Sequence, residues 1–164
     1  MYLLPTIELV ERLKRAIDGR RAIEIGSGNG VLAEALGIQG TDNFMQEMPK
    51  YKALYAAQGQ PTIKYGKNVE NLDALAAIKK YKPEVVVAAW VTHRFSFLRP
   101  QAGGNEIGVD EEKVIDSGAE YVFVGNKSVH SGKKIWERKY QYIEYPDYIF
   151  SRAQGSQDFL ASWK

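Results

Sequence analysis

The chain has 164 residues, of which 45% are hydrophobic and 26% are charged, and its formal net charge is +2. This composition is typical of a globular protein with a sizeable core, so we expect one domain spanning residues 1–164. The small net charge argues against a nucleic-acid partner. The sequence contains no cysteine, which excludes disulfides, zinc–thiolate sites and cysteine nucleophiles.

The N-terminal segment does not have the pattern of a secretory signal, because Glu8, Glu11 and Arg12 interrupt a short apolar run. No apolar run approaches the roughly 20 residues that a membrane span requires. We therefore expect a cytoplasmic protein with no membrane partner.

Helical and extended patterns alternate along the chain. Residues 6–18 carry apolar side chains at three- and four-residue spacing, which predicts an amphipathic helix. The elements predicted after it are a strand at 22–25, a helix at 31–36, a strand at 38–41, a helix at 44–57 that Pro49 interrupts, a strand at 62–65, a helix at 72–80 capped by Asn71, a buried strand within 83–91, a helix at 110–117 and a buried strand at 120–124.

The C-terminal region is rich in aromatic residues on both sides of Pro146 and Asp147, which predicts two strands joined by a turn. Together these elements predict a three-layer α/β sandwich. Its sheet would be Rossmann-like and mostly parallel, with about seven strands and an antiparallel C-terminal pair. Long loops are expected at 93–109 and 125–132, and loops of such length in compact domains are often functional.

Three glycines follow the first predicted strand at every second position, as Gly26, Gly28 and Gly30. A strand that turns directly into a helix needs a tight turn, and a ligand that lies against the turn needs bare main chain. The spacing differs from the G-x-G-x-x-G of dinucleotide binders, because residue 31 is valine. The turn could also occur without any ligand.

Asp42 ends the second predicted strand, about 20 residues after the first strand begins. A carboxylate at this place can accept hydrogen bonds from both hydroxyls of a ribose, because it has two oxygens and the diol has two donors. Asp42 could alternatively cap the helix that follows it.

The run Glu24-Ile25-Gly26-Ser27-Gly28-Asn29-Gly30, followed by Gly40-Thr41-Asp42, resembles the class I S-adenosylmethionine-dependent methyltransferases. The resemblance covers most of the chain. It implies that the protein binds S-adenosyl-L-methionine and transfers its methyl group. The residues that it implies for cofactor binding are Glu24, Gly26, Ser27, Gly28, Asp42, Asn43, Asn68, Val69 and Trp90.

Within this set, the resemblance implies that Glu24 orients the amino-acid end of the cofactor and Asp42 holds the ribose. Asn43 and Phe44 would border the adenine, and Asn68 would accept from its amino group. Trp90 would lie beside the methyl donor and the acceptor. Asn68 could equally be a turn residue, and Trp90 could belong to the core.

His93 follows the fourth predicted strand and is the candidate general base, since an imidazole titrates near neutral pH. It could instead be an ordinary loop histidine. The segment 88–95 lacks the Asn/Asp-Pro-Pro-aromatic run of amino-methylating nucleic-acid enzymes in the family, which favours a small-molecule or protein acceptor. No metal site is expected.

Two further questions stay open in the sequence. A module that binds the cofactor without transferring its methyl group would share the same glycine turn and carboxylate. The aromatic C-terminal strands could serve a homodimer or a partner subunit, or simply pack in the sheet.

Overall fold

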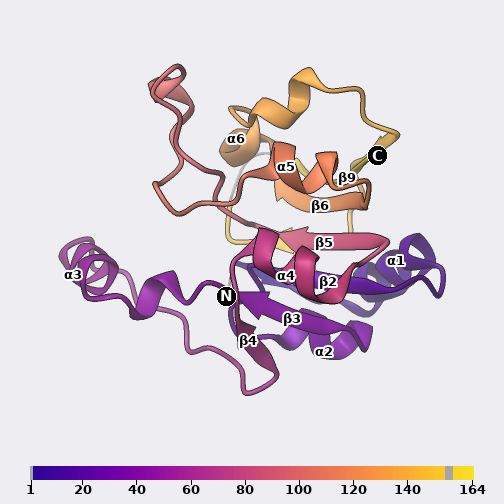
Figure 1. The fold of residues 1–164 in the computed structure, drawn as a ribbon, viewed down its shortest axis with the longest axis horizontal. Helices are drawn as coiled ribbons and strands as arrows, with labels where there is room; N and C mark the ends of the chain where they lie inside the picture. The colour runs from indigo at the N-terminus through magenta and orange to yellow at the C-terminus, as the bar shows by residue number, and fades with distance from the viewer. Residues whose placement is uncertain (1, 154–156) are drawn as a thin grey trace.

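The computed structural model describes residues 2–153 and 157–164 (Figure 1). Its main feature is a seven-stranded sheet in the order β4-β3-β2-β5-β6-β9-β7. Strand β9 runs antiparallel to both of its neighbours, and the other strands run parallel to one another. The bounds are β2 Ala22–Ile25, β3 Gln39–Asp42, β4 Val69–Asn71, β5 Val85–Ala89, β6 Glu120–Asn126, β7 Tyr142–Glu144 and β9 Asp158–Trp163.

Helices cover both faces of this sheet. Helices α1 and α2 pack on one face, where they contact β5 through Val85 and Val87. Helices α4 and α5 pack on the other face, against Val86 and Ala88 of the same strand, and lie in front of the sheet in Figure 1. The helix bounds are α1 Ile7–Ile17, α2 Val31–Leu36, α3 Pro49–Ala57, α4 Ala74–Tyr81, α5 Glu111–Asp116 and α6 Lys127–His130. The fold is therefore the predicted three-layer, Rossmann-like α/β sandwich.

One predicted strand is wrong. Residues 62–65 alternate in polarity but form no strand; the third parallel strand is β4, which pairs with β3. The side chains of the 62–65 segment explain the difference. Ile63 donates its main-chain N–H to Gln46 Oε1 at 2.7 Å, and the Tyr65 ring stacks on Phe44 at 4.1 Å. The segment is thus held by side-chain contacts and not by a sheet ladder.

The sheet has the predicted antiparallel C-terminal pair, but the two segments on either side of Pro146 and Asp147 do not pair with each other, so the predicted strand–turn–strand unit is wrong. Strand β7 pairs with β9, whereas the strand after Pro146, β8 (Phe150–Ser151), pairs antiparallel with β1 (Leu3–Leu4) in a separate small sheet. The buried strand β9 was not predicted. It fills the space between β6 and β7, and its six residues all pair with β6.

Several element ends match the sequence and a few do not. Helix α1 is capped by Thr6, whose Oγ1 accepts from Leu9 N at 3.2 Å. Helix α3 restarts at Pro49 after a short 3-10 turn, η1 (Met45–Glu47). The cap of α4 is Asp73 and not Asn71, because β4 occupies residue 71.

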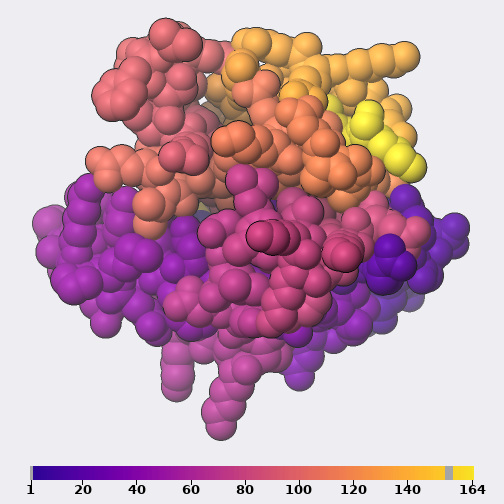
Figure 2. Space-filling view, in the orientation of Figure 1, coloured from indigo at the N-terminus to yellow at the C-terminus, as the bar shows by residue number. Residues whose placement is uncertain are grey.

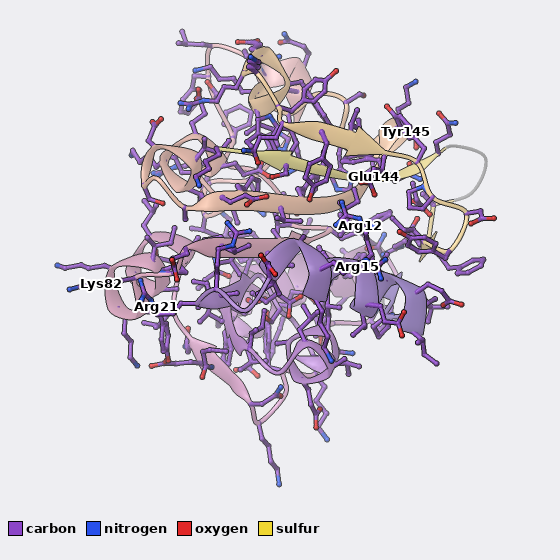
Figure 3. The ribbon with its side chains drawn as sticks, turned by 90° about the vertical axis from the view of Figure 1, so that its right-hand side faces the viewer. Arg12, Arg15, Arg21, Lys82, Glu144 and Tyr145 are labelled. Carbon is purple, nitrogen blue, oxygen red and sulfur yellow. The ribbon has the colours of Figure 1, made fainter. Side chains whose placement is uncertain are left out.

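An ion pair joins the first helix to the edge strand β7. Arg12 on α1 points toward Glu144 on β7 (Figure 3) and pairs with it at 2.6 Å. The loop at 93–109 is irregular apart from the 3-10 turn η2 (Pro100–Ala102), and it projects at the upper left of Figures 1 and 2. Arg99 of this loop pairs with Glu137 at 2.8 Å. Within the described residues, no helix is long and apolar enough to cross a membrane.

Candidate functional site

The carboxyl ends of β2, β3 and β5 open into a crevice of about 1200 Å³. The strand order reverses here, since β3 and β4 follow on one side of β2 and β5 and β6 lie on the other. Ligands of open parallel sheets bind at such switch points. A smaller pocket of about 470 Å³ runs along the glycine turn, and Gly26 and Ile63 line both spaces.

The glycine turn requires glycine for two separate reasons. Gly26 and Gly28 have φ values of +63° and +54°, which residues with a side chain rarely adopt. A Cβ atom on Gly26 would also lie 2.5 Å from Val91 Cγ1, and one on Gly28 would lie 3.3 Å from Ile63 Cδ1. The places where their Cβ atoms would lie are thus taken up by Val91 and Ile63. Gly26 lines both the crevice and the smaller pocket, whereas Gly28 lines the smaller pocket.

The Asp42 carboxylate is held against this turn. Its Oδ2 accepts from Gly28 N and its Oδ1 accepts from Phe44 N, both at 3.0 Å. Burial raises the pKa of Asp42, and these hydrogen bonds, with one from the Tyr65 side chain, oppose the rise. The structure therefore brings together the glycines and the carboxylate that the sequence singled out, and Asp42 lines the crevice.

Glu24 and Ser27 form a buried pair beneath the turn. Glu24 is 2% exposed and accepts from Ser27 Oγ at 2.8 Å. Burial raises the pKa of Glu24 to about 7, although the hydrogen bond from Ser27 opposes the rise. Both residues line the smaller pocket. Glu24 can therefore gain or lose a proton near neutral pH in response to a nearby charge.

The remaining predicted cofactor residues lie in different places. Asn43 lines the crevice, but its Nδ2 donates to Ile107 O at 2.9 Å and so ties the long 93–109 loop to the end of β3. Asn68 donates to Gly30 O at 2.9 Å. Neither Asn68 nor Val69 is among the residues that line the crevice or the smaller pocket. They support the glycine turn from behind.

The position of Asn68 follows from the misplaced third strand. The expectation for Asn68 assumed that residues 67–70 come after that strand, whereas Val69 lies within β4. The first polar residue beyond β4 that lines the crevice is Asp73. Its Oδ1 accepts from Leu75 N and Ala76 N at the start of α4. An aspartate before a helical run is a capping signal, and this signal could have located the boundary.

Trp90 follows β5 in an unusual main-chain conformation, with φ +59°. Such strain in a residue with a large side chain often marks a functional site. The indole packs between Tyr2, at 6.1 Å between ring centres, and His130, at 5.1 Å. Its buried Nε1 has no hydrogen-bond partner in the part of the chain that the structure describes. Trp90 lines the crevice.

His93 also lines the crevice, at the base of the long loop. Burial lowers its pKa, and the positive charge of Lys133 lowers it further. Its Nε2 is buried and lacks a hydrogen-bond partner among the described residues. The ring is therefore neutral at neutral pH and could accept a proton.

A buried ion pair that the sequence analysis missed supports the same wall of the crevice. Lys133 is 1% exposed and donates to Glu111 Oε2 at 2.8 Å and to Val91 O at 2.9 Å. Glu111 Oε1 accepts from Tyr121 Oη at 2.6 Å. This network fixes the main chain between Trp90 and His93. Nothing in the sequence distinguishes Lys133 from the surface lysines around it.

No family model and no curated protein matches this chain. Among solved structures, the crystal structure of the SAM dependent methyltransferase from Agrobacterium tumefaciens aligns with a TM-score of 0.36 and 12% sequence identity. The alignment covers 98% of this chain and 62% of that one, so the chain spans about three fifths of the length of that protein. The class is therefore defined by the chain's own topology, a Rossmann-like sheet with a crevice at its switch point.

Proposed function

We propose that this protein is an S-adenosylmethionine-dependent methyltransferase that acts on a small-molecule or protein acceptor. The observation that carries the proposal is the contact between Gly28 N and Asp42 Oδ2 at 3.0 Å, at the edge where the strand order reverses. It places a carboxylate beside bare main chain. This combination suits a nucleoside, because the carboxylate can accept from ribose hydroxyls while the bare turn admits the rest of the molecule closely.

The residues present fit an adenosyl group. A carboxylate has about four acceptor sites, and Gly28, Phe44, Asn43 and Tyr65 already donate to Asp42. A ribose hydroxyl would therefore take the place of the Tyr65 hydroxyl on this carboxylate. Asp73, at the end of the next strand, offers a carboxylate to an exocyclic amine. Phe44 and Tyr65 stack at 4.1 Å, which leaves no room for a ring between them. The adenine would therefore lie on the side of Asp73.

The other end of the cofactor would lie along the smaller pocket. Glu24 would receive its ammonium group, directly or through water, and Gly26 would let the main chain approach closely. When bound, S-adenosylmethionine supplies a methyl group on a positively charged sulfur. The residues of the chain then have to hold the acceptor in line with that methyl group and exclude other geometries.

His93 is the residue that we propose as base, for acceptors that must lose a proton. It is neutral at neutral pH because burial and Lys133 lower its pKa. The hydrogen bond from Lys133 to Val91 O would keep the wall that carries His93 in place. The proton would pass to the imidazole as the acceptor atom gains its methyl group.

Calorimetric titration with S-adenosylhomocysteine tests the cofactor assignment. We expect binding by the wild type and a loss of about tenfold or more in Asp73→Asn, since the hydrogen bond to the adenine amine is to a charged group. Asp110→Asn is the matched control, because Asp110 also caps a helix and lines the crevice. Equal losses in the two variants would remove Asp73 from the site.

Binding of NAD without S-adenosylhomocysteine would contradict the proposal as a whole. Binding of S-adenosylhomocysteine with no transfer from S-adenosylmethionine to any acceptor in a broad panel would support the second function, a binding module.

A further inference from the structure

We propose that Tyr2, Tyr55 and Arg152 form a binding site for the anionic group of a planar organic acid, at the end of the crevice where Tyr2 and Arg152 also line the smaller pocket. We identify that acid as the methyl acceptor, and this identification rests on the proposed function. The three residues come from the N-terminus, from α3 and from the segment after β8. Pairing of β1 with β8 brings two of them together, and Arg152 N donates to Tyr2 O at 3.0 Å.

Arg152 supplies the positive charge. Its guanidinium Cζ lies 4.9 Å from the centre of the Tyr2 ring, which fixes the group over an aromatic face. Within residues 2–153 and 157–164, no carboxylate lies within ion-pair distance of Arg152, whereas Arg12, Arg20 and Arg99 each have one. An exposed guanidinium that lines a crevice without a partner is suited to bind a carboxylate through two parallel hydrogen bonds.

The two tyrosines supply further donors. Burial raises the pKa of Tyr55 to about 12, and the nearby Tyr2 hydroxyl contributes to the rise. A tyrosine hydroxyl is protonated at neutral pH, and Tyr55 lines the crevice, so its O–H can donate to an anion bound there. The positive charge of Arg152 acts on the same hydroxyl. This end of the crevice thus presents a cation and O–H donors together.

The neighbouring wall indicates a flat ligand. The Tyr2 ring stacks on Trp90 with an angle of 28° between the planes, and the Trp90 ring meets His130 edge-on. These rings continue from Arg152 toward the place where Trp90 and His93 line the crevice. A planar acid could lie on this aromatic wall with its charged group at Arg152 and its ring toward His93.

Benzoate and its neutral isostere benzamide provide the test, with the indole N–H resonance of Trp90 as the reporter. Trp90→Phe assigns that resonance among the three tryptophans of the chain. We expect benzoate to bind about tenfold more tightly than benzamide. Arg152→Gln should abolish this preference and Tyr55→Phe should weaken it. Arg94→Gln is the matched control, since Arg94 is also exposed, lines the crevice and has no ion pair among the described residues.

Three results would overturn the inference: no benzoate binding, equal binding of benzoate and benzamide, or equal losses in Arg152→Gln and Arg94→Gln. Titrations with two cofactor analogues test one competing ligand, the amino-acid end of the cofactor. If Arg152→Gln weakens S-adenosylhomocysteine but not methylthioadenosine, which lacks the amino-acid end, Arg152 holds the cofactor's carboxylate and the inference is wrong. If neither nucleoside binds but benzoate still binds through Arg152, the anion site is supported and the proposed function fails.

Discussion

Replacing Gly26 with alanine is the sharpest perturbation that the glycine turn allows. The residue has φ +63°, so a side chain there is strained in any surroundings, at about 1–2 kcal/mol. The new Cβ would also lie 2.5 Å from Val91 Cγ1. Val91 is 6% exposed and branched at Cβ, so its methyl group cannot easily rotate away.

The two contributions can be estimated separately. Forcing an extra methyl group into a packed interior typically costs about 1–3 kcal/mol. Added to the main-chain strain, this predicts that Gly26→Ala lowers the free energy of unfolding by about 2–5 kcal/mol. Gly19 supplies the control, because it has φ +70° but a Cβ atom added there would meet no other atom within 4 Å. Gly19→Ala should show the strain alone, about 1–2 kcal/mol.

Urea unfolding of Gly26→Ala, Gly19→Ala, Val91→Ala and the double variant Gly26→Ala/Val91→Ala measures both contributions. Truncating Val91 should relieve the contact, so the double variant should be more stable than the sum of its single changes predicts. The reasoning would be refuted if Gly26→Ala were no less stable than Gly19→Ala, or if the two changes were simply additive.

Three further predictions concern buried ionisable groups. The pKa of Glu24 is raised from its ordinary 4.5 to about 7, so the folded chain holds this proton more tightly and its stability falls as pH rises between those values. Glu24→Gln should remove that fall in the free energy of unfolding, which amounts to about 3 kcal/mol. Urea unfolding of the wild type and the variant from pH 4 to pH 8 measures the difference. His130, whose pKa burial lowers to about 3, should show no ring titration by NMR above pH 5; a midpoint near 6.5 would contradict its burial. Lys133→Met should destabilise the fold by about 3–5 kcal/mol in urea, because it leaves Glu111 buried without its cation, and a loss below 1 kcal/mol would mean that water replaces the ammonium.

The sequence alone determined those elements that depend on signals within a short stretch of chain. Strand β2, helix α2 and the restart of α3 at Pro49 lie where the spacing of apolar residues, the glycines and the proline predict them. The glycine turn and Asp42 were also identified in this way, because a turn before a helix and a carboxylate at the end of a strand follow from chain order. These features fixed the three-layer architecture and the edge where a ligand would bind.

Tertiary contacts decided the rest. The 62–65 segment alternates like a strand, yet Gln46 and Phe44 hold it outside the sheet, and this shift moved the crevice-lining residue from Asn68 to Asp73. Likewise, β9 pairs with β6 across a long interval of chain. Lys133 and Arg152 both look like surface cations in the sequence, but one is buried beside Glu111 and the other lines the crevice beside Tyr2. The spacing of apolar residues predicts which face of its own helix or strand a residue occupies. The partners of that residue come from distant segments, which only the folded chain brings together.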